Sequence, residues 1–199
     1  MIITIGRQHG SMGHEIARKL SEKLNIPCYD KEIVDEAAAN SPFSKEIFDS
    51  YDERRVASYI MPAPHYVGLH QGFQLNMEVA NAQFDAVRGL ADKGDGIFVG
   101  RCADYILRNR AELLRVFIYS DLNSRVHTIM KRKGIDEDAA KKLIKAVDKD
   151  RASYYRYYTD QVWGEENNYD LIINSSRLGV EGSAQVILAC AEEMIKMSL

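Results

Sequence analysis

The chain has 199 residues, of which 46% are hydrophobic and 28% are charged, and its formal net charge is −3. This size suits one compact domain with an ample core, and the charge provides no basic field that would attract nucleic acid. The cysteines are too few and too widely spaced for a disulfide framework or a four-cysteine metal site; they are Cys28, Cys102 and Cys190. No basic leader precedes a long apolar run and no apolar stretch approaches about 18 residues, so we expect a cytoplasmic protein with no membrane partner.

The first residues predict a buried strand, a glycine loop and the start of a helix. Residues 2–5 form an apolar run typical of a central parallel strand, and apolar residues recur at helical spacing over residues 16–24. Gly6, Gly10 and Gly13 lie between the two patterns, where they allow sharp turns and a close approach of the backbone to a ligand. Because a helix N-terminus offers unpaired N–H groups and a positive dipole end, the loop predicts a phosphate site, with a plain strand-to-helix turn as the alternative.

The loop differs from the consensus phosphate loop, G-x-x-x-x-G-K-[ST], at both of its chemically important positions. If Gly10-Ser11-Met12 occupies the turn before the helix, Gly13 stands at the lysine position, and His14 and Glu15, which follow it, offer no hydroxyl that would contact magnesium. We expect Glu15 to complement the helix dipole from the first turn rather than to point into the loop. The dinucleotide spacing G-x-G-x-x-G is also absent, which makes a dehydrogenase the least supported function.

A second strand and helix are followed by an irregular segment. Residues 26–29 are a strand candidate, and Asp30 is suited to cap the helix that comes next. The periodicity weakens from residue 40 to residue 72, where prolines and glycines interrupt the chain. Such a segment in a compact domain is usually an active-site flap or a disordered surface loop, and both remain open here. A helix of nearly five turns is expected after it, over residues 75–90.

An arginine and an aspartate follow the third predicted strand, the apolar run 97–99. They are Arg101 and Asp104, and ligands of open α/β sheets bind at the carboxyl ends of the strands. Arg101 could hold a phosphate, and Asp104 could hold a magnesium-bound water or a sugar hydroxyl. An ion pair between the two that caps the next helix is an equally good interpretation.

The second half of the chain continues the alternation, with strands expected over residues 115–119 and 170–174 and helices over residues 122–133, 136–158 and 180–195. On the long helix, steps of about 100° per residue place Arg151 on the apolar face and Arg156 on the opposite side. A buried guanidinium needs a counter-charge, so Asp148, Asp150 or a ligand anion would neutralise Arg151. Five successive strand–helix units predict an α/β fold in which helices cover both faces of a five-stranded parallel sheet.

Three features of the chain occur together in one family: the glycine loop, the Gly100-Arg101-Cys102-Ala103-Asp104 turn and the Asp148-Lys149-Asp150-Arg151 helix segment. With them the chain resembles the cytidylate kinase-like family of P-loop nucleoside monophosphate kinases over nearly its whole length. The resemblance implies a three-layer P-loop kinase fold in a single domain. Its parts would be a core at residues 1–39, 73–131 and 159–199, an insertion at 40–72 that binds the nucleoside monophosphate, and a helical lid at 132–158.

The resemblance also implies ligands and site residues. Phosphoryl transfer would run from ATP with Mg²⁺ to a nucleoside monophosphate, most favourably CMP or dCMP, so the partners would be small-molecule nucleotides. The ATP phosphates would be bound by Arg7, Gly10, Ser11, Met12, Gly13, His14 and Glu15. The acceptor would be bound by Arg101, Asp30 and Arg54; the catalytic residues would be Arg151, Arg132 and Asp104, with Arg125 and Arg156 as further lid residues. No metal site built from protein side chains alone is expected.

Two departures from the family pattern leave a second class of function open. Known cytidylate kinases carry the loop lysine, whereas this chain is more similar to a branch with a basic residue one place later, here His14. The aspartate that follows the family's Gly-Arg pair is Cys102 here, so the resemblance does not determine base specificity. The alternative to an active kinase is a catalytically weak or inactive nucleotide-binding regulatory protein that keeps the kinase fold.

Overall fold

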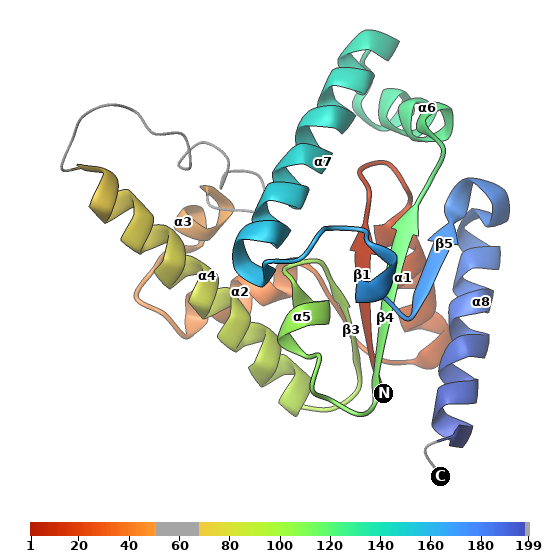
Figure 1. Cartoon of the computed structure of the whole chain (residues 1–199), viewed down its shortest axis with the longest axis horizontal. Coiled ribbons are helices and arrows are strands. Elements are labelled where there is room, and N and C mark those ends of the chain that lie inside the picture. Colours follow the sequence, from red (N-terminus) through yellow and green to blue (C-terminus); the bar gives the residue numbers. More distant parts are fainter. Residues whose placement is uncertain (51–67, 198–199) are drawn as a thin grey trace.

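The computed structural model describes residues 1–50 and 68–197, which form one β-sheet with helices on both faces (Figure 1). The strands are β1 (Ile2–Arg7), β2 (Cys28–Tyr29), β3 (Gly96–Val99), β4 (Leu113–Tyr119) and β5 (Leu171–Asn174). Their order is β2-β3-β1-β4-β5, and every neighbouring pair is parallel. The three-layer α/β fold and the five-stranded parallel sheet predicted from the sequence are confirmed.

The helices of the described ranges are α1 (Gly13–Leu24), α2 (Lys31–Ala39), α3 (Lys45–Ser50), α4 (Gly68–Asp92), α5 (Ala103–Ile106), α6 (Leu122–Lys133), α7 (Glu137–Thr159) and α8 (Ser175–Met197), with the 3₁₀ helix η2 (Glu166–Asn168). Every helix that the apolar periodicity predicts is present. The helix α3 was not predicted, because its six residues are too few to show a helical period. The four-residue helix α5 was expected after Arg101 and Asp104, but without bounds.

Alternating side chains of the central strand build two separate cores. Ile3 and Ile5 of β1 are fully buried with residues of α1 and α8, whereas Ile2, on the other face, packs with residues of α2 and α4. Successive side chains of a strand point to opposite faces, so a strand covered by helices on both sides needs apolar residues at consecutive positions. The apolar run at the start of the chain therefore makes β1 the centre of the molecule.

The sheet register brings three chain segments together at one edge. Ile5 of β1 pairs with Val99, the last residue of β3, and with Val116 of β4. The loop after β1 and the turn after β3 consequently start side by side at the carboxyl edge of the sheet. The helices α6 and α7 rise beyond this same edge (Figure 1).

The long helix α7 is anchored at both of its ends. Its N-terminal half packs on α6 through a small apolar cluster of Val126, Ile129, Ala140 and Ile144. Its last turns bury Tyr154 and Tyr155 beside Cys102, in the turn that follows β3. The helix thus spans from α6 to the sheet and carries Arg151 past the carboxyl edge.

The predicted cap of α2 is wrong. Asp30 directly precedes α2, but its φ and ψ are −131° and −77° and its side chain makes no capping hydrogen bond. Its Oδ2 atom instead lies 3.0 Å from Nδ1 of His14, in the first turn of α1. The contact between α1 and the end of β2 therefore takes this carboxylate away from the helix terminus.

The irregular segment predicted over residues 40–72 is described only in part. Its first residues, including α3, and the start of α4 belong to the described ranges, whereas Arg54 lies outside them. The interpretation of this segment as a nucleotide-binding insertion stays a prediction. Within the described ranges, no helix combines the length and apolar character that crossing a bilayer requires.

Candidate active site

The loop between β1 and α1 is tightly built. Met12, with φ of 63° and ψ of 16°, makes a left-handed turn directly before α1 begins at Gly13. Ser11 is fully buried: its Oγ donates to the carbonyl of Gln8 at 2.9 Å, and its own carbonyl accepts a hydrogen bond from Oγ of Ser175 at 2.7 Å. The loop is thereby fixed from within and from α8, with the first N–H groups of α1 at its rim. Such a rigid loop at a helix N-terminus can receive an anion.

The helix α6 lies against this loop at Gly10. A Cβ atom at this position would be 3.0 Å from the carbonyl oxygen of Arg125 and 3.2 Å from Cγ1 of Ile129, and φ is +82°. Any other residue would meet both the steric contact and the strain of a left-handed backbone. The missing side chain of Gly10 therefore makes room for α6.

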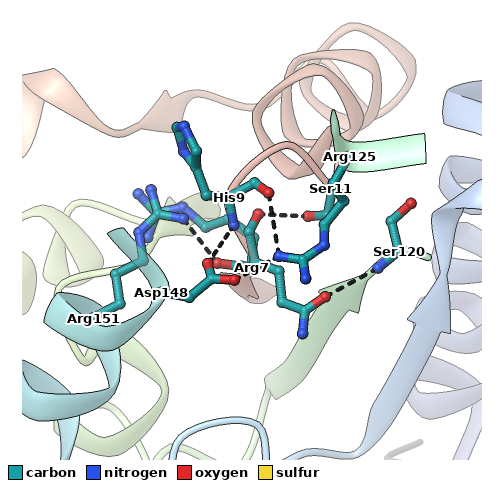
Figure 2. Close-up of polar contacts among 8 residues, drawn as sticks. Arg7, His9, Ser11, Ser120, Arg125, Asp148 and Arg151 are labelled. Atoms are coloured by element: carbon teal, nitrogen blue, oxygen red, sulfur yellow. Dashed lines mark hydrogen bonds and ion pairs between the residues drawn. The ribbon is translucent and has the colours of Figure 1, made fainter. Parts of the chain in front are cut away.

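A partly buried carboxylate joins the loop, α6 and α7. Asp148 of α7 accepts a hydrogen bond on Oδ1 from the backbone N–H of His9 at 2.7 Å, and its Oδ2 lies 2.5 Å from Nη1 of Arg125 of α6. Figure 2 shows the carboxylate of Asp148 facing the backbone of His9. Arg125 also reaches toward the carbonyl of His9, at 3.5 Å. Asp148, one of the residues considered as a counter-charge for Arg151, is thus paired with Arg125.

Beside the loop, side chains from four segments enclose a cavity of about 20 Å³. It is lined by three arginines, one from the end of β1, one from the turn after β3 and one from α7: Arg7, Arg101 and Arg151. Among the described residues of the lining, Asp104 contributes a carboxyl group, and tyrosines and Trp163 also take part. Nη1 of Arg151 donates to the carbonyl of Arg7 at 3.0 Å, which connects α7 to β1.

The backbone at the turn after β3 is strained. Arg101 and Cys102 both have φ of 54°, in the left-handed region that residues other than glycine rarely adopt. Arg101 is only 5% exposed. Two consecutive residues in this conformation are consistent with a site in which the position of a side chain matters, because backbone strain concentrates at functional sites.

Asp104 is held by a tyrosine of α7. The carboxylate is buried, and Tyr155 donates its hydroxyl hydrogen to Oδ2 at 2.6 Å. Burial raises the pKa of Asp104 to about 6, although the hydrogen bond from Tyr155 acts in the opposite direction. Burial also raises the pKa of Tyr155, which keeps this hydroxyl a donor. The charge of the arginine-lined cavity therefore changes near pH 6.

Charged residues at the rim of the loop form pairs with one another. Oε1 of Glu15 lies 2.5 Å from Nη2 of Arg132, and the same nitrogen is 3.9 Å from Sδ of Met12. His14 and Asp30 are paired as described above. Glu15 is in the first turn of α1, as expected, and its charge is balanced by Arg132.

The part of the chain that the structure describes offers no cluster of metal-binding side chains at this edge. The described residues contain no group of three or more His, Cys, Asp or Glu side chains that could hold a metal ion. Glu15, in the first turn of α1, is engaged by Arg132.

Most of the predicted site residues lie at the carboxyl edge of the sheet. Their positions form two groups that do not follow the roles predicted from the sequence. One group lines the cavity: Arg7, Arg101, Asp104 and Arg151. A second group contacts the loop from α6: Arg125 and Arg132. Arg156 is exposed on the far side of α7, and Arg54 lies outside the described residues.

Sequence reasoning missed the partners of two of these residues. It identified neither the bridge from Asp148 to the loop nor Tyr155 as the donor to Asp104. The tyrosines on the inward face of α7 were the available signal for the contact between Tyr155 and Asp104. The contact between Asp148 and the loop depends on the angle between α6 and α7, for which the sequence has no local signal.

The raised pKa of Asp104 predicts a specific pH dependence of stability. A carboxyl group whose pKa is higher in the folded protein than its ordinary 3.8 contributes stability below about pH 4, and this contribution is lost as the pH rises through about 6. Asp104→Asn keeps the acceptor for Tyr155 but cannot titrate. We expect the free energy of unfolding of Asp104→Asn, relative to wild type, to rise by on the order of 3 kcal/mol from pH 4 to pH 7 in urea titrations.

Asp170 provides the matched control. Burial acts to raise the pKa of Asp170, but hydrogen bonds from Arg115 and its charge outweigh burial and lower it. Such a group contributes stability above its ordinary pKa and loses it as the pH falls, so Asp170→Asn should show a pH trend of the opposite sign. A flat difference between Asp104→Asn and wild type would show that Asp104 titrates at its ordinary pKa.

Known proteins resemble this chain over most of its length. The model of the cytidylate kinase-like family matches residues 2–177. A cytidylate kinase of Methanothrix thermoacetophila is 28% identical over 191 residues, which cover 95% of this chain and 96% of that protein. A cytidylate kinase of Methanocaldococcus jannaschii is 26% identical over 201 residues, which cover 98% of this chain and 100% of that protein.

Solved structures share the whole fold. An uncharacterized protein from Eubacterium ventriosum superposes with a TM-score of 0.75 at 29% identity, covering 96% of this chain and 98% of that chain. Shikimate kinase from Bacteroides thetaiotaomicron has a TM-score of 0.57 at 14% identity, with the same coverage of 96% and 98%. The second likeness shows the fold alone. Together, the family match over most of the chain, the relatives of equal length and the P-loop kinase fold establish that the chain belongs to the cytidylate kinase-like family.

Proposed function

We propose that the protein transfers the γ-phosphoryl group of ATP to a nucleoside monophosphate, with CMP or dCMP as the preferred acceptor. The observation that carries the proposal is the convergence of Arg7, Arg101 and Arg151 on one cavity beside the loop that leads into α1. Guanidinium groups next to a helix N-terminus provide the positive charge that phosphate groups require. The relatives named cytidylate kinase support the choice of acceptor.

In the proposed reaction, donor and acceptor phosphates approach from two sides of the cavity. The loop from Gly10 to Gly13 binds the donor phosphates, Arg101 binds the acceptor phosphate, and Arg151 contacts the group in transfer. An acceptor phosphate oxygen attacks the γ-phosphorus; the bond from that phosphorus to the β–γ bridging oxygen breaks, and its electron pair leaves with ADP. Charge on the transferred group is spread over three equatorial oxygens, so positioning and electrostatic stabilisation supply most of the catalysis.

The proposal gives α7 the role of a lid. A cavity of about 20 Å³ has room for about one water molecule, so a phosphate group enters only when α7 or the segment after it shifts. Residues 132–158 would move with Arg151, and residues 40–72, with Asp30 and Arg54, would bind the acceptor. Magnesium would enter with ATP and help neutralise the phosphates when bound. Closure of the lid would then exclude water from the transferred group.

One observation favours a different function, a nucleotide-binding regulatory protein without transfer. The carboxylate of Asp148 accepts a hydrogen bond from the loop N–H of His9, so one loop donor already faces a negative charge. Donor phosphates that approached this part of the loop would be repelled as long as α7 keeps its position. A protein of this kind would bind nucleotide, change the position of α7 and transfer nothing.

The acceptor preference is tested by measuring ADP release with ATP and magnesium for each common nucleoside monophosphate. We expect higher kcat/KM with CMP, dCMP or UMP than with AMP or GMP. Equal or greater turnover with a purine monophosphate would contradict the preference but not the transfer. ATP binding without turnover for any acceptor would favour the regulatory function.

The lid role of Arg151 is tested by Arg151→Met, which removes the charge and keeps most of the apolar stem. We expect kcat to fall by about 10³-fold or more, as for other arginines that stabilise this transition state, with a melting temperature close to that of wild type. Arg156→Met removes the same charge from the exposed side of the same helix and should leave kcat unchanged. Early melting of Arg151→Met with normal turnover of the folded fraction would instead assign Arg151 to the scaffold.

A further inference from the structure

We infer that Arg7 replaces the lysine of the phosphate loop, so that the charge on the donor phosphates comes from the end of β1 instead of the start of α1. The inference rests on the proposed function, because it concerns how the same loop binds ATP. It addresses the main departure of this chain from the consensus loop, the glycine at position 13.

The side chain of Arg7 occupies the space that a side chain at position 13 would need. A Cβ atom at Gly13 would lie 2.6 Å from Cβ of Arg7 and 3.0 Å from its Cγ. Non-bonded carbon atoms make their best contact at about 3.5–4.0 Å. Position 13 therefore has no room for a side chain while Arg7 keeps its present position. The arginine at position 7 thus gives a steric reason for the absence of a lysine at position 13.

The position of Arg7 suits the task that the lysine would perform. Arg7 is the last residue of β1 and lines the cavity with Arg101 and Arg151. Figure 2 shows Arg7 and Arg151 on the same side of the loop, and the hydrogen bond from Arg151 holds the Arg7 carbonyl. A guanidinium group stays charged at every physiological pH and can donate to two phosphate oxygens at once.

Three further basic residues near the loop lie in ion pairs with carboxylates. The pairs are His14 with Asp30, Arg125 with Asp148 and Arg132 with Glu15. Arg7 lines the cavity together with Arg101 and Arg151. Three guanidinium groups that line one cavity attract an anion, so Arg7 is placed to exchange some of its present contacts for a phosphate.

Because a side chain at position 13 conflicts with Arg7, the inference is tested by changing these two positions singly and together. Arg7→Gly removes the charge and the Cβ atom, and we expect it to weaken binding of inorganic tripolyphosphate about 10- to 100-fold in calorimetry, as for a lost hydrogen bond to a charged group. Gly13→Lys alone should lower the melting temperature, because its side chain conflicts with Arg7. The double variant should melt above Gly13→Lys and bind tripolyphosphate at least about tenfold more tightly than Arg7→Gly.

Two further variants keep the test decisive. Arg7→Met keeps the Cβ atom and the stem, so a similar loss of binding in this variant does not depend on how well Arg7→Gly folds. Arg18→Met removes one charge from the exposed side of α1 and should bind tripolyphosphate as wild type does. The inference is overturned if Arg7→Met binds like wild type, if the folded double variant binds no better than Arg7→Gly, or if wild type does not bind at all.

The choice of tripolyphosphate separates this inference from the proposed function. Its binding requires neither an acceptor nor a transfer step. A wild-type protein that binds tripolyphosphate through Arg7 but releases no ADP with any acceptor would contradict the proposed function and support the inference. Turnover that is unchanged in Arg7→Met would support the proposed function and contradict the inference about Arg7.

Discussion

The carboxylate of Asp148 is the contact on which the geometry of the site depends. It joins the loop through the N–H of His9 and α6 through Arg125, and both charged side chains are largely buried, with exposed fractions of 18% and 11%. Loss of one partner of such a pair typically costs about 3–5 kcal/mol, because it leaves a buried charge uncompensated. Arg151 follows Asp148 by one helical turn, so the same contact determines where this arginine meets the carbonyl of Arg7.

The charges around the loop are divided into two zones. At the rim and toward α6, each of three basic residues has a carboxylate partner. In the cavity, the described lining residues include three guanidinium groups and the carboxyl group of Asp104, whose pKa is raised to about 6 by burial. The arginines gather positive charge where our proposal places the transferred phosphoryl group, and protonation of Asp104 removes a negative charge from this place. The division gives phosphate a defined destination although the protein as a whole is slightly acidic.

The sequence was sufficient for the fold and for the neighbourhood of the site, but not for the contacts. Apolar runs and helical periods located every strand and long helix, because a sheet buried on both faces imposes these patterns locally. The exclusion between Arg7 and Gly13 depends on the path of a loop, and the pairing of Asp148 with Arg125 depends on how two helices cross. The predicted cap at Asp30 failed for the same reason, since a partner on α1 competes for its carboxylate.

The central claim is that this arrangement moves a phosphoryl group between nucleotides and does more than hold one. Phosphorus NMR of a mixture of the protein, ATP, magnesium and CMP follows every phosphate species at once. Transfer predicts that ADP and CDP appear in equal amounts while inorganic phosphate stays at the level of a sample without protein. ATP that persists unchanged beside bound nucleotide, or that is converted to ADP and inorganic phosphate without CDP, would contradict the claim.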